Sequence, residues 1–261
     1  MNLDRATIDV IIPTYNSQEF LLEAINSCFI QTHPVNEVII VDDGSSETFI
    51  AYLTELRVSF PRLRVILNNH TGLPGIGRQI GINASDAEWI AFLDSDDYWA
   101  PEKIEKQIKS ADLTNSNLVY SNGWIVKAGS TEEIFFNEFP KKISFSELLA
   151  TNWLLNSSVI VKRELFSSRT SYATSVRLRA VEDYATWLRL ATICTFSGVN
   201  EPLTYYRDHS GSIRLQDVLD PRIHAIADFM DWAHARESSE KKRMRKFIKM
   251  AIKAFKNQYL P

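Results

Sequence analysis

The chain has 261 residues, of which 45% are apolar and 23% charged, enough to bury one large hydrophobic core or two small ones. This composition excludes a disordered or fibrous protein. The formal net charge of −3 is uneven, because residues 241–256 carry eight lysines and arginines and no acid, which leaves −11 on the rest of the chain. Such an asymmetry concerns binding partners more than it concerns the fold.

The two cysteines, Cys28 and Cys194, lie far apart and outside any cysteine or histidine ligand spacing. This argues against a disulfide framework and against a thiolate zinc site, and it favours a reducing compartment. The first residues lead directly into a strand-like segment, and no apolar run reaches the roughly 18 residues that span a bilayer. We therefore expect a cytoplasmic protein.

Apolar, β-branched segments alternate with helix-patterned segments in the first half of the chain. The predicted strands are Ile8–Ile12, Val38–Val41, Leu63–Leu67, Trp89–Leu93 and Leu118–Tyr120. The predicted helices are Glu19–Ile30, Glu47–Val58, Ile76–Ala84 and Pro101–Leu113. This order predicts an α/β fold with a mostly parallel central sheet and flanking helices, in which ligands bind where the strands end.

The alternation weakens after Asn122. There we expect an edge strand at Thr131–Phe136, a short helix at Ser144–Thr151, a strand at Ser158–Val161 and a helix at Glu182–Thr192. A strand at Thr195–Val199 and two closing helices at Arg222–Arg236 and Glu240–Lys256 follow. We divide the chain into a large α/β domain over residues 1–218 and a C-terminal helical extension over residues 219–261.

Carboxylates follow the predicted strand Trp89–Leu93 directly, at Asp94, Asp96 and Asp97. Hard divalent cations such as Mg²⁺ and Mn²⁺ take oxygen ligands, typically one or two carboxylates together with substrate phosphates. An Asp-x-Asp at a strand end therefore suits a metal-bridged diphosphate. The alternative is a simple turn that caps the next helix.

Four motifs in chain order resemble the family 2 glycosyltransferases of the GT-A fold. They are Val10-Ile-Ile-Pro-Thr-Tyr-Asn16, Glu37-Val-Ile-Ile-Val-Asp-Asp-Gly-Ser-Ser46, Trp89-Ile-Ala-Phe-Leu-Asp-Ser-Asp-Asp-Tyr-Trp-Ala-Pro101 and Glu182-Asp-Tyr-Ala-Thr-Trp-Leu-Arg189. The resemblance covers roughly residues 7 to 215. It implies a nucleotide-sugar donor, a divalent metal (Mn²⁺ or Mg²⁺) at the Asp-x-Asp element, and a later carboxylate that deprotonates the acceptor hydroxyl.

Carried over by motif, the resemblance places Pro13, Thr14, Tyr15 and Asp43 around the nucleoside, with Tyr15 offering a stacking face and Asp43 accepting from a base N–H. Arg78 occupies the position of an arginine that contacts the nucleotide. The family pattern there is commonly Ala-Arg-Asn, whereas this chain has Gly77-Arg78-Gln79, and the alternative is a charge on a helix surface.

The resemblance further assigns Asp94 and Asp96 to the metal, with Asp96 as the direct ligand, and it places Asp94 and Ser95 at the nucleotide-sugar. Asp183 matches the catalytic base, and Glu182 would orient it or the acceptor. The alternative for Glu182-Asp183 is a helix N-terminus with first-turn acids.

Tyr205–Ile213 resembles a family loop that closes over the diphosphate. His209 is assigned as a third metal ligand or phosphate donor, and Arg207 and Ser212 as phosphate contacts. A surface histidine in an exposed loop is the alternative. His33, His70, His224 and His234 receive no role.

The function expected from these motifs is inverting transfer of a hexosyl or N-acetylhexosaminyl group from a nucleotide-sugar, with uridine diphosphate favoured by the resemblance. The acceptor would be a glycan or lipid-linked glycan in bacterial surface polysaccharide or lipid-linked oligosaccharide assembly. A dehydrogenase is disfavoured, because Pro13-Thr14-Tyr15-Asn16 stands where Gly-x-Gly-x-x-Gly should follow the first strand. A catalytically silent nucleotide-sugar binder or membrane scaffold is the alternative.

The basic segment 241–256 has an apolar stripe at helical spacing, which predicts an amphipathic helix. Such a helix suits an anionic membrane surface on the inner face of the cytoplasmic membrane, or it packs on the catalytic domain through its stripe. No recognised nucleic-acid-binding fold accompanies the basic residues, so we expect no nucleic-acid partner.

Overall fold

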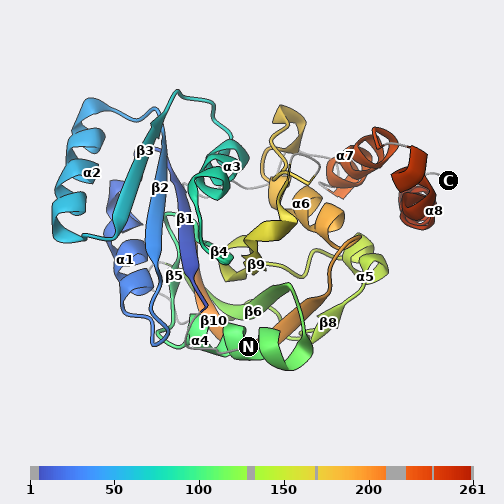
Figure 1. Ribbon diagram of the computed structural model, residues 1–261, viewed down its shortest axis with the longest axis horizontal. Coiled ribbons are helices and arrows are strands. Elements are labelled where there is room, and N and C mark those ends of the chain that lie inside the picture. The colour runs from blue at the N-terminus through green and yellow to red at the C-terminus, as the bar shows by residue number, and fades with distance from the viewer. Residues whose placement is uncertain (1–5, 128–132, 168–169, 210–221, 237, 260–261) are drawn as a thin grey trace.

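One mixed sheet runs through the molecule, with helices on both faces (Figure 1). The computed structural model describes residues 6–127, 133–167, 170–209, 222–236 and 238–259. Within these residues the strands are β1 (Ile8–Thr14), β2 (Glu37–Asp43), β3 (Leu63–Asn68), β4 (Trp89–Phe92), β5 (Tyr98–Trp99), β6 (Leu118–Lys127), β7 (Glu133–Ile134), β8 (Lys142–Ile143), β9 (Ile160–Lys162) and β10 (Phe196–Asp208). The helices are α1 (Gln18–Phe29), α2 (Glu47–Ser59), α3 (Pro74–Ala84), α4 (Lys103–Thr114), α5 (Phe145–Ala150), α6 (Glu182–Leu190), α7 (Arg222–His234) and α8 (Ser238–Tyr259), with 3₁₀ turns η2 (Asn156–Ser158), η3 (Arg163–Leu165) and η4 (Val176–Leu178).

The strand order is β3-β2-β1-β4-β9-β6-β10-β5, with β7 beside β6 and β8 beside β10. The strands β3, β2, β1 and β4 are parallel, as the alternating strands and helices predict. Their carboxyl ends therefore meet at one edge of the sheet. The short strand β9 is antiparallel to both β4 and β6, and it joins the parallel half to the second half of the sheet.

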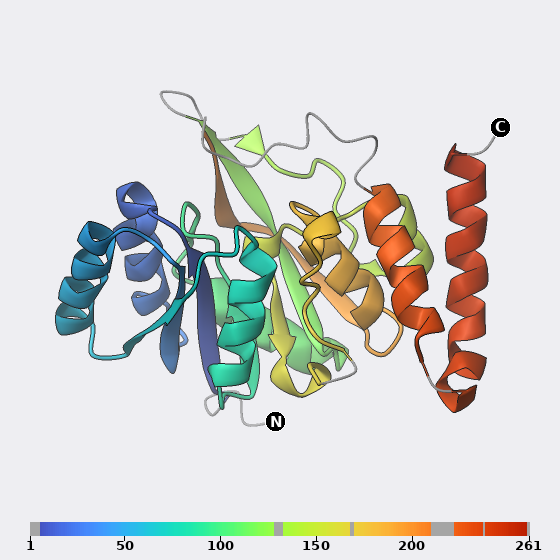
Figure 2. The same ribbon diagram turned by 90° about the horizontal axis from the view of Figure 1, so that it is seen from above.

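Successive residues of the central strands point to opposite faces, so each strand contributes to two hydrophobic clusters. Ile8, Val10 and Ile12 of β1 pack with the buried faces of α1, α2 and α4. Ile11 packs on the other face, in a cluster that also contains apolar residues of α3, α5, α6, α7 and α8. The result is three layers, with α1 and α2 on one side of β1 and α3 on the other (Figure 2).

The closing helices α7 and α8 complete the second cluster. Ala225 and Phe229 of α7 are fully buried, and Met244 and Ala251 of α8 are 5% and 0% exposed. The Phe247 ring lies 4.9 Å from the ring of Phe145 in α5. The apolar stripe of α8 thus packs on the rest of the molecule, as one of the two predictions for this helix stated.

The second half of the sheet shows the main differences from the sequence prediction. We expected a strand over Thr195–Val199 and a loop from Tyr205, but β10 continues to Asp208, because Tyr205–Asp208 pair with β6. The two-residue strands β5 and β8 were not predicted, since two residues carry no periodicity. In the part of the chain that the structure describes, no helix combines the length and the apolar character needed to cross a bilayer.

Candidate active site

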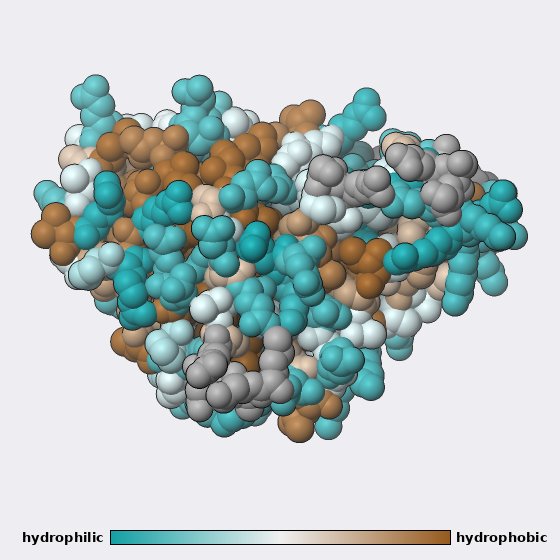
Figure 3. Space-filling view, viewed as in Figure 1, coloured by the Kyte–Doolittle hydropathy of each residue, from teal (hydrophilic) through white to brown (hydrophobic). Residues whose placement is uncertain are grey.

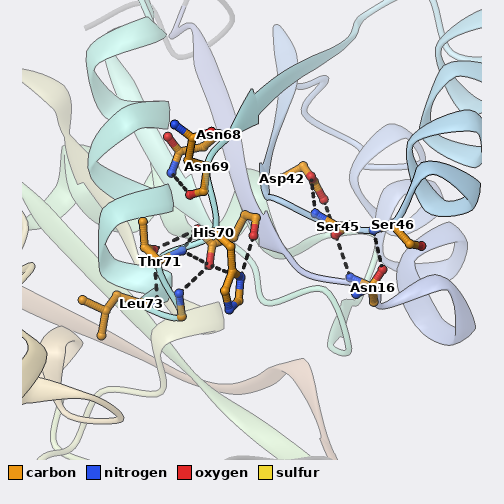
Figure 4. Close-up of polar contacts among 11 residues, drawn as sticks. Asn16, Asp42, Ser45, Ser46, Asn68, Asn69, His70, Thr71 and Leu73 are labelled. Atoms are coloured by element: carbon orange, nitrogen blue, oxygen red, sulfur yellow. Dashed lines mark hydrogen bonds and ion pairs between the residues drawn. The ribbon is translucent and has the colours of Figure 1, made fainter.

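Polar side chains gather where β1, β2 and β4 end. Asp42 at the end of β2 is fully buried, and its carboxylate accepts from the N–H and the hydroxyl of Ser45. Asn16, which follows β1, accepts from the Ser46 N–H through its side-chain oxygen and donates its own N–H to the Ser45 hydroxyl (Figure 4). These bonds tie the β1–α1 loop to the β2–α2 loop.

Asp43 organises the loop that leads from β3 to α3. Its carboxylate accepts from the N–H groups of Thr71 and Gly72 and from the Thr71 hydroxyl, at distances of 2.7 to 3.1 Å. His70 Nδ1 lies 2.8 Å from the Asp43 carbonyl oxygen (Figure 4). The predicted contact between Asp43 and a base N–H would compete with these bonds, so the main observed role of Asp43 is to hold the loop.

Tyr15 and His70 form an exposed pair of rings at this edge. The ring centroids are 4.4 Å apart and 51% of Tyr15 is exposed, which leaves Tyr15 available for the predicted stacking. The sequence analysis gave His70 no role. Its position two residues after β3, at the edge where ligands bind, is the signal that could have identified it.

The turn after β2 needs a glycine at residue 44. Gly44 has φ +74°, and a Cβ there would lie 2.6 Å from the His70 backbone nitrogen. Any other residue would push the His70 loop away from the strand. The Gly44 turn therefore sets where the Tyr15–His70 pair stands.

Arg78 is buried and bridges two carboxylates from distant parts of the chain. One guanidinium nitrogen lies 2.7 Å from Asp94 Oδ1 and the other lies 3.1 Å from Glu182 Oε1. The alternative of a helix-surface charge is therefore wrong. The side chain also lies over the Tyr172 ring, 5.5 Å from its centroid. Both partners of Arg78 are carboxylates. A nucleotide that contacts Arg78 would therefore share its positive charge with Asp94 and Glu182.

A turn that the sequence analysis overlooked positions the acidic residues after β4. Asn156 Nδ2 donates to Asp94 Oδ1 at 3.0 Å and its Oδ1 accepts from the Tyr172 hydroxyl. The Ser157 hydroxyl donates to Asp97 Oδ2 and accepts from the Asp94 N–H. Asp97 itself is fully buried, so it faces this turn and not a ligand. Nothing in the local sequence of η2 indicates these long-range partners.

Asp183 stands in the first turn of α6, next to Glu182. Burial and the neighbouring Glu182 carboxylate raise the pKa of Asp183 to about 7, although Arg78 acts in the opposite direction. A carboxyl group with such a pKa can accept a proton near neutral pH. Glu182 Oε2 is buried and has no hydrogen-bond partner among the described residues. Glu182 therefore acts on Asp183 by its charge and through Arg78.

The side chains of Asp96 and His209 come together, with Oδ2 and Nε2 2.9 Å apart. Burial and the nearby Asp94 raise the pKa of Asp96, while the hydrogen bond from His209 lowers it. A carboxylate oxygen and an imidazole nitrogen suit Mn²⁺ or Mg²⁺ once substrate phosphates supply further oxygens. In the described residues no group of three or more metal-binding side chains occurs, because Asp94 turns toward Arg78 and Asn156.

Arg207 supports Asp96 from the end of β10. Its guanidinium donates to the Asp96 carbonyl oxygen at 2.6 Å and to Glu23 Oε2 at 2.7 Å, and it lies 4.2 Å from the Phe20 ring centroid. Its backbone N–H donates to Asp97. The predicted phosphate contact of Arg207 would require it to leave these partners.

The remaining predicted residues lie around this edge. Thr14 is buried, and its hydroxyl forms a hydrogen bond with the Ser17 hydroxyl. Pro13 packs against Gly77, where an added Cβ would lie 3.1 Å from the Pro13 Cβ. Ser95 is half-buried in the turn between Asp94 and Asp96. Ser212 lies outside the described residues.

Comparison with known sequences decides the family. The family described as "Glycosyl transferase family 2" matches residues 9–163, more than half of the chain. The chain belongs to glycosyltransferase family 2. Asp183 and His209 lie beyond the matched region, so their assignment depends on the geometry described above.

Relatives of this chain include a named glucosyltransferase and an uncharacterized glycosyltransferase. The chain is 30% identical over 79% of its length, and 79% of the relative's, to the Escherichia coli UDP-Glc:alpha-D-GlcNAc-diphosphoundecaprenol beta-1,3-glucosyltransferase WfaP. It is also 30% identical to an uncharacterized glycosyltransferase of Rickettsia felis, over 84% of this chain and 35% of that protein. The chain thus spans about a third of the length of the Rickettsia relative.

The fold of this chain is shared with S. aureus TarS 1–349 in complex with UDP-GlcNAc, with a TM-score of 0.73 and 18% identity over 97% of this chain and 73% of that chain. The predicted GT-A fold is therefore confirmed.

Proposed function

We propose that this protein is an inverting glycosyltransferase that uses a UDP-sugar donor and an acceptor hydroxyl on a glycan or lipid-linked glycan, in surface polysaccharide or lipid-linked oligosaccharide assembly. The observation that carries the proposal is Asp183, a base whose pKa is close to neutral, which is linked through Glu182 and Arg78 to Asp94 at the strand edge. The activity for which the E. coli relative WfaP is named supports the donor and acceptor classes.

Asp183 would start the reaction. Its carboxylate accepts the proton of the acceptor hydroxyl, and the hydroxyl oxygen forms a bond to the anomeric carbon of the donor sugar. The bond between that carbon and the diphosphate oxygen breaks, and the nucleoside diphosphate leaves with the electron pair. One displacement inverts the anomeric configuration, so an α-linked donor gives a β-linked product. Base catalysis of this kind contributes about 10² to 10⁴ in rate.

The diphosphate end of the donor would lie at Asp96 and His209, which are the residues that fit a divalent cation. When bound there, the cation supplies positive charge to the leaving diphosphate. Asp94 and Arg78 keep the edge in place, and Arg207 fixes the Asp96 backbone.

The nucleoside end would lie over the β1 and β2 ends. The exposed Tyr15 ring offers the stacking face, next to His70. Pro13 and Thr14 shape the floor, and Asp43 holds the 70–72 loop that borders it.

The decisive experiment compares the wild-type chain with Asp183→Asn. UDP-sugars are offered with a short-chain lipid-diphosphate GlcNAc acceptor, and the product's anomeric configuration is read by nuclear magnetic resonance. We expect a β-linked product from the wild type, loss of transfer in Asp183→Asn, and unchanged UDP affinity in both. Asp86→Asn, an exposed carboxylate, is the matched control and should keep full activity. Near-normal turnover by Asp183→Asn would refute the base assignment, and UDP binding without any turnover by the wild type would indicate a silent binder.

A further inference from the structure

Five lysines form one row along α8. Lys242, Lys246, Lys249, Lys253 and Lys256 follow one another at alternating steps of four and three residues, and all five are exposed. Steps of this size return to the same face of an α-helix, so the row extends about 21 Å along the helix axis.

The one acid of α8, Glu240, lies ahead of the row and within ion-pair distance of Arg236. From residue 241 to residue 259 the sequence contains no Asp or Glu. Among the residues that the structure describes, none of the five lysines has a carboxylate within ion-pair distance. Like charges three and four residues apart repel each other, so the row would be relieved by a negatively charged partner.

The opposite face of α8 is already used. Met244 and Ala251 are buried, and Phe247 contacts the Phe145 ring. The helix therefore presents charge to the outside and keeps most of its apolar residues inside. Ile252, with 38% of its surface exposed, lies at the border of the two faces.

The place of α8 in the fold makes the row accessible along its whole length. The helix is the outermost element at its end of the molecule, beyond α7 (Figure 2). Hydrophilic side chains lie at the outer edge of this end in the space-filling view (Figure 3). A straight row on an outermost helix can meet an extended flat surface at all five positions, whereas a compact anion would meet one or two.

We propose that the lysine row of α8 docks this enzyme on the anionic headgroups of a lipid bilayer, by charge and without insertion of the helix. The inference rests on the proposed function in one respect, since a lipid-linked acceptor would lie on such a surface. The remaining −11 of the chain would be repelled by the same surface, so the row would also set which end of the molecule approaches it.

The test measures binding of the full chain to vesicles of phosphatidylcholine with about one third phosphatidylglycerol, compared with pure phosphatidylcholine. Each lysine near an anionic surface contributes roughly a factor of five to binding. Lys246→Gln/Lys249→Gln/Lys253→Gln should therefore weaken binding about 100-fold. Binding of the wild type should also fall steeply as salt rises from about 0.05 to 0.5 M.

The matched control is Arg57→Gln/Lys141→Gln/Lys142→Gln, which removes the same charge from exposed positions elsewhere and should bind like the wild type. Ile252→Ser should also bind like the wild type, and a large loss there would mean that the helix inserts. Equal binding by the α8 triple variant, equal binding to neutral vesicles, or tighter binding to duplex DNA at the same salt would overturn the proposal. Sugar transfer to a detergent-dispersed acceptor is measured separately, so loss of docking and loss of catalysis are distinguishable.

Discussion

If Asp183 is the base, as proposed, activity would depend on pH in a direction that its surroundings fix. Because burial and Glu182 raise its pKa to about 7, the carboxyl group holds its proton below that pH and cannot accept another. We expect kcat/KM to rise with pH, by about tenfold per unit at pH values well below 7, and to level off above it. A rate profile from about pH 5 to pH 9 checks this. A flat profile would contradict the role of Asp183.

Asp96 provides the second test at the scale of a residue. Asp96→Ala removes the carboxylate that faces His209, while Asp97 stays engaged with Ser157 and Arg207. We expect the variant to lose Mn²⁺-dependent binding of UDP, as measured by calorimetry. If the Mn²⁺-dependent binding persists unchanged, the role of Asp96 is limited to the structure of the turn after β4.

Asn156 is a positioning residue, because it holds Asp94 and is itself held by Tyr172. Asn156→Leu keeps the volume but removes both hydrogen bonds, one of them to a charged group. Such a bond corresponds to roughly a 10- to 100-fold change, which we expect in the affinity for UDP. Ser158→Ala in the same turn, whose hydroxyl donates to the Leu155 carbonyl, should change affinity little. Equal effects of the two variants would mean that the turn acts only through stability.

The position of a strand end predicts part of the candidate site, whereas Arg78, Glu182 and Asp183 are assigned only through the family resemblance. Asp43, Asp94 and Asp96 are found from the strand ends, because the parallel strands bring their carboxyl ends together. The partners of Asp94 could not be found, since Asn156 is 62 residues away and is brought close by the antiparallel strand that follows it. The burial of Arg78 could not be predicted from the sequence either, because it depends on a contact with Glu182, which lies 104 residues later.

At the scale of elements, the sequence predicts the parallel half well and the second half less well. The strands β1, β2 and β4 are largely buried, mostly apolar runs whose pattern depends little on neighbours, whereas β3, at the edge of the sheet, buries only Leu63. The end of β10, in contrast, carries Tyr205, Tyr206 and Arg207, whose polarity reads as a loop. These residues form a strand because β6 is long enough to pair with them.

Packing of α8 gives a test at the same scale. Met244→Ala leaves a cavity in the cluster shared with α5 and α7, and we expect it to lower the free energy of unfolding by about 2 to 5 kcal/mol. Ile252→Ala on the exposed side should cost far less. Thermal unfolding checks both. Equal, small effects would mean that α8 does not pack on the domain in solution.

At the scale of the whole molecule, the proposed division into residues 1–218 and 219–261 describes function more than folding. Because α7 and α8 belong to the same hydrophobic cluster as α5 and α6, we expect one cooperative unfolding transition. Urea unfolding followed by circular dichroism and by tryptophan fluorescence should give coincident curves. Two separated transitions would show that the C-terminal helices are an independent unit.

The strand β9 has a consequence for the order of folding. It lies between β4 and β6 but follows both in the chain, so its pairing with them joins segments that are distant in the sequence. Pairing across such sequence separations is slow, because the intervening loops must close first. The η2 turn, which precedes β9 by one residue, is carried in with it, and it brings the partners of Asp94 and Asp97. Pairing of β9 and positioning of Asp94 and Asp97 would therefore be coupled, and a chain with β9 unpaired would lack the partners of these two carboxylates.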